Sequence, residues 1–519
     1  MYMLHRARGI GLSVRVYEAG DGVGGTWYWN RYPGARCDVE SMQYSYQFSD
    51  ELQQEWEWSE RYATQPEILT YANHVADRFD LRRDMQFETR VLSATYDEAT
   101  ARWTVRTDNG SGEPEEVSAQ FLIMATGCLS SARIPDFAGL DTFEGETYHT
   151  GRWPHDGVDF TGKRVAVIGT GSSGIQSIPI IAKQAGELVV FQRTASYSVP
   201  AYNAPLDVAD QRKIKDNYAA FRAENSLSPT AIGSRIPTVE VSALAVDPAE
   251  RERVYEERWE HGGLPFLGAF FDLLIDKMAN DTAAEFVRHK IHEIVKDPAV
   301  AELLTPNTVI GCKRLCVDTG YFDTFNRDNV ELVDVSTEPI SEITPKGLRV
   351  GNRDYEFDCI VFATGFDAMT GALLSIDIQG SDGQTLQEAW VAGPRTYLGL
   401  NSVGFPNFFT ISGPGSPSVL TNMIVSIEQH VNWITDCIAY LRETGHRRIE
   451  ATLAAQDEWV DFVNMVADFT LFPSCNSWYL GANVPGKPRV FMPLLGFPTY
   501  AAKCDDVAAK GYEGFVLSR

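Results

Sequence analysis

The sequence lacks the features that mark several large classes of protein. No cluster of Lys and Arg stands out and the formal charge is -25, so we expect no nucleic-acid surface. The most apolar stretch, Pro265 to Leu274, is short and contains Asp272, whereas a membrane span needs about 20 apolar residues. The first residues do not resemble a secretory leader. We therefore expect a cytoplasmic protein that contacts neither membrane nor nucleic acid.

The cysteines are too scattered for a metal or dithiol site. None shows the C-x-x-C spacing of a zinc ribbon or of a redox-active pair, which argues against a disulfide reductase and predicts no metal. We interpret all eight as buried thiols in a reducing compartment. They are Cys37, Cys128, Cys312, Cys316, Cys359, Cys437, Cys475 and Cys504.

The 519 residues are too many for one hydrophobic core of usual size, and roughly two to four domains are expected. Several short β-branched runs are typical of buried parallel strands, and helical stretches lie between some of them. This alternation indicates an α/β architecture whose ligands bind at the carboxyl ends of the strands. The expected strands are Val14 to Glu18, Phe121 to Ala125, Arg164 to Ile168, Leu188 to Gln192, Val330 to Val333 and Cys359 to Ala363.

A change of pattern marks an insertion in the middle of the chain. Between Pro205 and Pro306 the strand pattern ends, and charged amphipathic segments such as Pro248 to His261 and Thr282 to Lys296 predict helices. The tripeptide A-T-G recurs after two of the expected strands, at residues 125–127 and 363–365. We interpret its two copies as the points at which the chain passes between domains.

The clearest nucleotide-binding motif is G-x-G-x-x-G, formed by Gly169, Thr170, Gly171, Ser172, Ser173 and Gly174. It follows an expected strand, and its glycines permit a tight turn that presents backbone N–H groups to a pyrophosphate. The next strand ends in Arg193-Thr194, where an acid would contact the ribose of NAD, and an arginine there suits the 2′-phosphate of NADPH. The alternative is a glycine turn that serves packing alone.

A second dinucleotide site is indicated at the amino end. The expected strand Val14 to Glu18 ends in an acid that would accept hydrogen bonds from an adenosine ribose, and Gly22-Val-Gly-Gly25 follows it. Such a unit normally begins with another strand and its own glycine-rich turn, and we expect both to be missing here, as in a truncated chain. The alternative for Glu18 is an exposed acid at a strand end.

Residues 143–154 carry the most specific signal. Phe143-Glu-Gly-Glu-Thr-Tyr-His149-Thr-Gly-Arg-Trp153-Pro154 matches every fixed position of F-x-G-x-x-x-H-T-x-x-W-P, the fingerprint of Baeyer–Villiger monooxygenases. The chain resembles this family, whereas related flavin monooxygenases that act on nitrogen or sulfur have another residue in place of the tryptophan. Alone, His149 would be interpreted as a structural histidine and Trp153 as a core aromatic. The resemblance implies that they couple the domains.

The resemblance extends through nearly the whole chain. Residues 24–38 resemble the family's flavin-side segment, Phe191 to Thr194 its NADPH-phosphate segment, and Lys313-Arg314 its active-site pair. Residues 477–488 match its carboxyl-terminal segment. The chain is most similar to the phenylacetone and steroid monooxygenase branch.

The resemblance implies an α/β fold with two Rossmann-like dinucleotide-binding domains, one for FAD and one for NADPH, and a helical insertion. The amino-terminal strand and FAD phosphate loop are expected to be missing. Residues 1–142 and 367–519 are the expected two parts of the FAD-binding domain, the second with the substrate-pocket loops. The expected NADPH-binding domain comprises residues 155–204 and 307–366, with the fingerprint linker at 143–154 and the insertion at 205–306.

The family's reaction assigns roles to several charged residues. Reduced FAD adds O2 to give a C4a-peroxide, which attacks a ketone and yields an ester or lactone, so the protein must stabilise negative charge. By resemblance, Arg314 supplies a permanent positive charge, and Asp38 pairs with it and sets its position. An ordinary surface ion pair is the alternative. Arg193 and Thr194 would bind the NADPH 2′-phosphate, with Lys313 adding a charge that disfavours NAD.

Further contacts are implied by the resemblance. Trp478 would hydrogen-bond the nicotinamide side, Met423 would touch FAD, and Ser418, Val419 and Leu420 would shape the ketone pocket. Core packing of Trp478 and a plain helix-entry loop before Met423 are the alternatives. The remaining cofactor contacts are expected at Gly25, Thr26, Trp27, Arg36, Cys37, Tyr44, Val91 and Gln176.

Two other functions stay open at this point. A flavin N- or S-monooxygenase would share the two-nucleotide layout, and an FAD-deficient pseudoenzyme or fragment would fit a missing phosphate loop. The expected partners are a ketone and O2, and the chain is expected to be a monomer or a weak oligomer.

Overall fold

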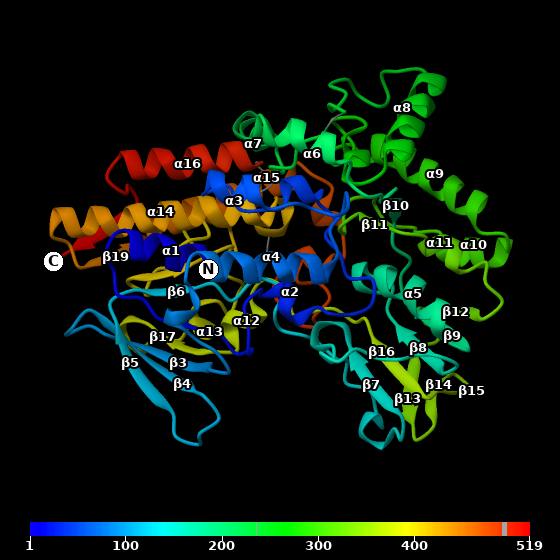
Figure 1. Ribbon diagram of the computed structural model, residues 1–519, viewed down its shortest axis with the longest axis horizontal. Coiled ribbons are helices and arrows are strands. Elements are labelled where there is room, and N and C mark those ends of the chain that lie inside the picture. The colour runs from blue at the N-terminus through cyan, green and yellow to red at the C-terminus, as the bar shows by residue number, and fades with distance from the viewer. Residues whose placement is uncertain (235, 490–491, 493–495) are drawn as a thin grey trace.

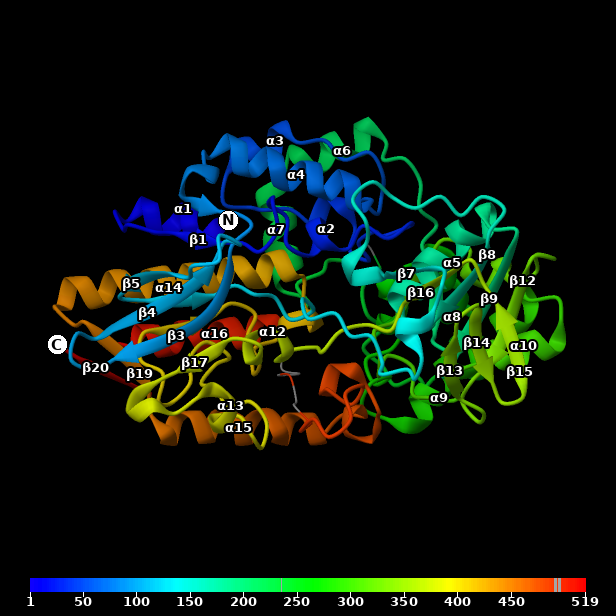
Figure 2. The same cartoon turned by 90° about the horizontal axis from the view of Figure 1, so that it is seen from below.

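The computed structural model describes residues 1–234, 236–489, 492 and 496–519. Its elements gather in two lobes that lie side by side along the long axis (Figures 1 and 2). One lobe combines elements from both ends of the chain, and the other is built from its middle part. Both lobes contain parallel strands together with helices, so the architecture is α/β as expected.

A five-stranded parallel sheet forms the centre of the middle lobe. Its strand order is β12, β9, β8, β16 and β7. Because both faces are covered, the central strands are largely apolar, and Val165 to Val167 in β8 are fully buried. The bounds are β7 Glu146–His149, β8 Arg164–Ile168, β9 Glu187–Gln192, β12 Val330–Asp334 and β16 Cys359–Phe362.

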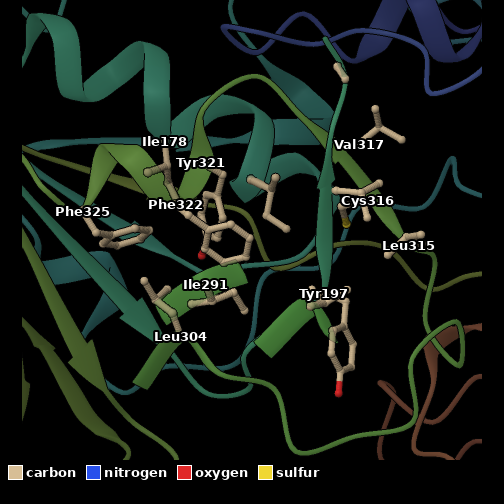
Figure 3. Close-up of a cluster of buried hydrophobic side chains, with 14 of the residues drawn as sticks. Ile178, Tyr197, Ile291, Leu304, Leu315, Cys316, Val317, Tyr321, Phe322 and Phe325 are labelled. Atoms are coloured by element: carbon tan, nitrogen blue, oxygen red, sulfur yellow. The ribbon is translucent and has the colours of Figure 1, made fainter. Parts of the chain in front are cut away.

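Helices cover one face of this sheet, and a second sheet covers the other. On the helical face, Ile178 of α5 (Ser172–Gln184) packs with Ile291 and with Phe322 of α11 (Tyr321–Thr324), as Figure 3 shows. The opposite face packs against three antiparallel strands, which are β13 (Ile340–Thr344), β14 (Gly347–Val350) and β15 (Arg353–Glu356). The parallel order places the carboxyl ends of β8 and β9 at one edge, where a ligand is expected.

The other lobe contains several small sheets. A four-stranded sheet has the order β17, β3, β4 and β5, while β1 pairs with β2 and β6 with β18 in parallel, and β19 pairs with β20. The bounds are β1 Val16–Tyr17, β2 Met85–Gln86, β3 Arg90–Asp97, β4 Arg102–Asp108, β5 Glu115–Ala119, β6 Leu122–Met124, β17 Asp377–Gln379, β18 Phe408–Thr410, β19 Arg448–Ala451 and β20 Phe515–Ser518. The expected absence of an amino-terminal strand and FAD phosphate loop is not tested by this arrangement and stays a prediction.

Long helices pack on these small sheets. α14 (Met423–Thr444) contacts both α1 (Tyr2–Gly9) and α16 (Phe497–Ala509), and its apolar side chains lie in the core of the lobe. α4 (Gln65–Arg78) and α15 (Leu453–Asp468) contribute to the same core. Among the described residues, even α14 with its 22 residues is not apolar enough to cross a membrane, and no other helix qualifies.

Every expected parallel strand is present, with small differences at the ends. Arg164 to Ile168 has the expected bounds. The run from Val14 to Glu18 is reduced to β1, because its other residues have no ladder partner in the described part of the chain. The antiparallel strands of both lobes were not expected from the sequence.

Helices fill the expected insertion. α8 (Pro248–His261) has the expected bounds, because the carboxylate of Asp247 accepts backbone N–H groups at its start and Pro248 occupies its first turn. α9 (Lys277–Ile294) begins earlier than Thr282, because Asp276 caps it, and ends before Lys296. The other helices are α6 (Val208–Lys215), α7 (Tyr218–Ser226) and α10 (Pro298–Leu304), and the described residues of the insertion form no strand.

The interpretation of all eight cysteines as thiols is wrong for one pair. Cys312 and Cys475 form a disulfide, with Cα atoms 6.2 Å apart. They are separated by 163 residues in sequence, so no local spacing could indicate the pairing. The other six cysteines are free and buried.

Candidate active site

The G-x-G-x-x-G turn lies where β8 leads into α5. Gly169 has φ of +110°, and a Cβ there would meet the carbonyl oxygen of Ala363 at 2.5 Å. A Cβ on Gly174 would meet the carbonyl oxygen of Gly169 at 2.3 Å, so the helix packs directly on the turn. By contrast, apart from its chain neighbours, no atom of the described residues lies within 4 Å of the Cβ position of Gly171, the N-cap of α5. This open side is the one that a phosphate needs to approach the helix N-terminus.

Two cations belong to the same region. Arg193 and Thr194 follow β9, and the carbonyl of Thr194 accepts a hydrogen bond from the hydroxyl of Thr170 at 3.1 Å, which joins the strand end to the turn. Burial lowers the pKa of Lys313, and the positive charge of Arg193 lowers it further, so the two cations are neighbours. Within the described residues neither forms an ion pair with a carboxylate. Two unpaired cations beside an open turn can bind an anionic group.

Arg314 and Asp38 form an ion pair between residues far apart in sequence. Arg314 Nε donates to Asp38 Oδ2 at 2.9 Å, and the two side chains are 24% and 10% exposed. Arg314 Nη1 also donates to the carbonyl of Val419 at 3.3 Å. Burial opposes the charged guanidinium, but the carboxylate of Asp38 together with Tyr479 and Cys37 outweighs burial, and the pKa of Arg314 is raised. Arg314 is therefore a permanent positive charge at working pH.

Gln176 connects this ion pair to α5. Its amide nitrogen donates to Asp38 Oδ1 at 3.4 Å and to the carbonyl of Arg36 at 3.1 Å. Its amide oxygen accepts the hydroxyl of Tyr32 at 2.8 Å. Asp38 is thus held by Gln176 on one oxygen and by Arg314 on the other, which fixes the direction of the guanidinium.

An apolar cluster adjoins Arg314. Besides the carbonyl of Val419, the guanidinium contacts the hydroxyl of Tyr479, and burial raises the pKa of Tyr479 to about 12 although Arg314 opposes the rise. The ring of Trp478 lies 4.3 Å from that of Tyr479, and Ser418 is fully buried next to Val419. The cluster contains Cys128, Ala368, Met369, Val419, Phe472, Tyr479 and Met492, with Leu129, Leu274, Leu420, Met423 and Trp478 packed against it. The structure therefore brings the expected pocket residues together with the expected catalytic cation.

The residues expected on the flavin side differ from one another in exposure and in hydrogen bonding. The indole N–H of Trp27 donates to the hydroxyl of Tyr44 at 3.2 Å, and Gly25 and Thr26 are exposed at the start of α2 (Thr26–Trp29). Glu18 accepts the backbone N–H of Gly20 at 2.8 Å.

Three other residues expected on this side have local roles. Arg36 pairs with Glu60 at 3.2 Å. Burial raises the pKa of Cys37 to about 12, so it is a neutral thiol. Val91 packs against the cluster that includes Ala94 and Met124, and no contact in the described residues links it to Arg314.

The histidine and the tryptophan of the fingerprint are buried and make structural contacts. His149, at the end of β7, accepts the N–H of Gly151 at 3.0 Å through Nδ1, and its Nε2 lies 3.2 Å from the carbonyl oxygen of Arg133. Burial lowers the pKa of His149, so it is neutral at working pH. Trp153 is buried against Tyr148, with ring centroids 5.5 Å apart.

Sequence reasoning missed two residues that contact the expected site. Tyr479 touches Arg314, and Tyr32 holds Gln176. Only their neighbours in the sequence could have indicated them, because Tyr479 follows Trp478 and Tyr32 lies in the flavin-side segment. A tyrosine without a spacing rule gives no indication of its own.

A family model described as "Flavin-binding monooxygenase-like" matches residues 37–207. The Baeyer-Villiger monooxygenase of Pseudooceanicola batsensis is 43% identical over 100% of this chain and 94% of that protein. The chain belongs to the Baeyer–Villiger monooxygenase family. The resemblance inferred from the fingerprint is therefore confirmed.

One solved structure and one further protein are also similar to this Baeyer–Villiger monooxygenase-family chain over its whole length. The structure of an oxidized steroid monooxygenase bound to NADP is 56% identical and has a TM-score of 0.94, with 100% of this chain and 97% of that one covered. Phenazine N-monooxygenase PhzNO1 of Lysobacter antibioticus is 40% identical over 100% of this chain and 95% of that protein. The identity to this protein, which is named for oxidation at nitrogen, is thus similar to the 43% identity to the Baeyer-Villiger monooxygenase.

Proposed function

We propose that this chain is an NADPH- and FAD-dependent monooxygenase that converts a ketone to an ester or lactone with O2. One observation carries the proposal most directly. The buried ion pair of Arg314 and Asp38 adjoins the apolar cluster of Val419, Met423 and Trp478. A permanent cation at the wall of an apolar pocket is the arrangement that stabilises negative charge developing on oxygen in a water-poor site.

The nucleotide sites follow from the same geometry. The open side of Gly171 and the cations Lys313 and Arg193 suit the pyrophosphate and the 2′-phosphate of NADPH. On the flavin side, the exposed Gly25 and Thr26 and the pair Trp27–Tyr44 would hold FAD. Bound FAD supplies hydride acceptance and activation of O2. The domain boundaries expected from the sequence are kept as part of this proposal.

The chain's own residues have separate tasks in this scheme. Asp38 and Gln176 orient the guanidinium of Arg314, whose N–H groups not used by Asp38 and Val419 can donate to an oxygen that becomes negative. Residues 418–420 and Trp478 exclude water from that side. Cys37 and Tyr479 stay protonated, so neither adds a negative charge next to the cation.

Oxidation at nitrogen is the second candidate, because a relative named for it is 40% identical to this chain. The tryptophan of the fingerprint was expected to argue against nitrogen oxidation. Both reactions would use the same cofactors and differ in the acceptor.

Purified protein incubated with NADPH and ¹⁸O-labelled O2 tests the proposal. Aryl, cyclic and steroidal ketones are compared with heteroaromatic amines, and products are identified by mass. One labelled oxygen in an ester or lactone is the expected result. A labelled N-oxide with no ester from any ketone would favour the second candidate, and protein that stays colourless after added FAD would favour a pseudoenzyme.

A further inference from the structure

The two stretches by which the chain crosses between the lobes form a short antiparallel pair. Ala132 is bridged to Phe366, the N–H of Arg133 donates to the carbonyl of Gly365 at 3.0 Å, and that of Asp367 donates to the carbonyl of Ser131 at 2.8 Å. We call residues 131–133 and 365–368 the crossing pair. Its first stretch comes shortly after the first A-T-G tripeptide, and its second stretch begins at Gly365, the last residue of the second; these tripeptides were expected to mark the domain crossings.

The carboxyl-terminal segment 475–487 is anchored to this crossing pair by two cations. The guanidinium of Arg133 donates to the carbonyl of Asn483, whose side-chain amide donates to the carbonyl of Phe366 at 2.8 Å. Lys487 pairs with Asp367 and donates to the carbonyl of Ala368 at 2.6 Å, with its side chain only 10% exposed. Both cations are partly buried, and charge-assisted hydrogen bonds are stronger than neutral ones, so these anchors contribute more than neutral loop contacts do.

The same crossing pair contacts the fingerprint. The carbonyl of Arg133 accepts the hydroxyl of Thr364 at 2.6 Å and lies 3.2 Å from His149 Nε2. The rings of His149 and Phe366 meet edge to face, 6.1 Å apart. The backbone of Arg133 therefore contacts the other stretch of the crossing pair and the fingerprint, and its side chain contacts the carboxyl-terminal segment.

The other end of the segment reaches the expected catalytic cation. Trp478 and Tyr479 lie in it, Tyr479 contacts Arg314, and Cys475 is bonded to Cys312, near Arg314 in the chain. A displacement of residues 483–487 would therefore move the aromatic wall next to the guanidinium.

We propose that Arg133 and Lys487 are positioning residues that hold Trp478 and Tyr479 against Arg314 by fixing the carboxyl-terminal segment to the crossing pair. The proposal rests on the role of Arg314 under the proposed function. Lys487 reaches the apolar cluster only at the carbonyl of Ala368, no contact in the described residues links either cation to Arg314, and both act through the segment.

The test uses Arg133→Met and Lys487→Met in the full-length, FAD-loaded protein. Arg489→Met is the matched control, because among the described residues the Arg489 guanidinium donates only to the segment itself, to the carbonyl of Cys475 at 3.3 Å and to Asn476 Oδ1 at 2.6 Å. Two quantities are measured: the share of consumed NADPH recovered as hydrogen peroxide instead of product, and the rate of protease cleavage within residues 475–489.

Both quantities should rise by about tenfold in the two variants, as expected for the loss of one charge-assisted hydrogen bond. The KM for ketone should rise with them, the rate of flavin reduction should stay unchanged, and Lys487→Arg should restore coupling. Arg489→Met should resemble the wild type. The proposal would be overturned if Arg133→Met and Lys487→Met coupled oxygenation and resisted the protease like the wild type. It would also be overturned if Arg489→Met showed the same increases as those two variants.

Failure of the proposed function gives a different pattern. In that case the wild type forms no oxygenated product, whereas faster cleavage of the variants without faster cleavage of the control still reports the anchoring. A lower melting temperature identifies a misfolded Arg133→Met or Lys487→Met. In that case the misfolded variant is replaced in the test by Arg133→Lys, which retains the charge. Wild-type cleavage rates in both Met variants would reject the anchoring whatever the reaction is.

Discussion

Replacing Glu428 by Gln is expected to stabilise the protein near neutral pH and to change little in mild acid. Glu428 lies in α14 and is 5% exposed. Its Oε1 accepts the N–H groups of Gln47 and Phe48 at 2.9 and 3.1 Å, while its Oε2 is buried without a partner among the described residues. Burial raises the pKa of this carboxyl from 4.5 to about 7, although these N–H groups and Arg222 oppose the rise.

Because the pKa of Glu428 is raised in the folded state, its contribution to stability falls with rising pH. The folded state holds the proton of Glu428 more tightly than the unfolded state, so its stability is fully present below pH 4.5 and is lost as the pH rises through 7. A pKa change from 4.5 to about 7 corresponds to about 3 kcal/mol, because one pKa unit is about 1.4 kcal/mol. Glutamine keeps an acceptor for the two N–H groups and cannot ionise.

Urea unfolding at pH 5, 6, 7 and 8 measures the effect. The wild type should lose stability relative to Glu428→Gln across this range, with a gap of about 3 kcal/mol at pH 8. Glu443→Gln, at an exposed position of the same helix, is the control and should run parallel to the wild type. Parallel curves for Glu428→Gln and the wild type would refute the assignment of a neutral, buried carboxyl.

Two further substitutions have defined outcomes. His430 is fully buried, accepts the N–H of Ser412 at 3.0 Å and contacts the hydroxyl of Tyr500 at 2.9 Å, and burial lowers its pKa from 6.5 to about 3. Its contribution is full above pH 6.5 and is lost as the pH falls toward 3, so urea unfolding should show a loss of about 2 kcal/mol between pH 8 and pH 5 that His430→Gln lacks. Lys313→Met should raise the KM for NADPH by about tenfold or more and leave that for NADH nearly unchanged, because it removes one charge-assisted phosphate contact. Equal effects on both nucleotides in steady-state kinetics would contradict that role.

Local patterns explain what could be predicted of the fold. The buried strand Arg164–Ile168 and the glycine turn after it are encoded by neighbouring residues, and the Asp247-Pro248 start of α8 is a capping signal read within one turn. The antiparallel strands β3 to β5 were missed because half of their side chains face solvent, so they lack the continuous apolar run that identified the parallel strands.

Contacts between residues far apart in the sequence limited how much of the candidate site could be predicted. Arg314 and Asp38 were named together only through the family resemblance, since nothing in their spacing connects them. The Cys312–Cys475 disulfide and the contact of Arg133 with Asn483 join segments more than a hundred residues apart, and each depends on how the lobes pack. Such pairs become visible only when the chain is folded.

The most direct measurement of the central claim compares Arg314→Ala and Arg314→Lys with the wild type in one reaction vessel. Flavin reduction by NADPH and the mass of the oxygenated product are followed with the same ketone. Reduction should persist in both variants, while product should be lost in Arg314→Ala and stay low in Arg314→Lys, because an ammonium lacks the fork of N–H donors that Asp38 aligns. Ester or lactone formed by Arg314→Ala at the wild-type rate would contradict the account.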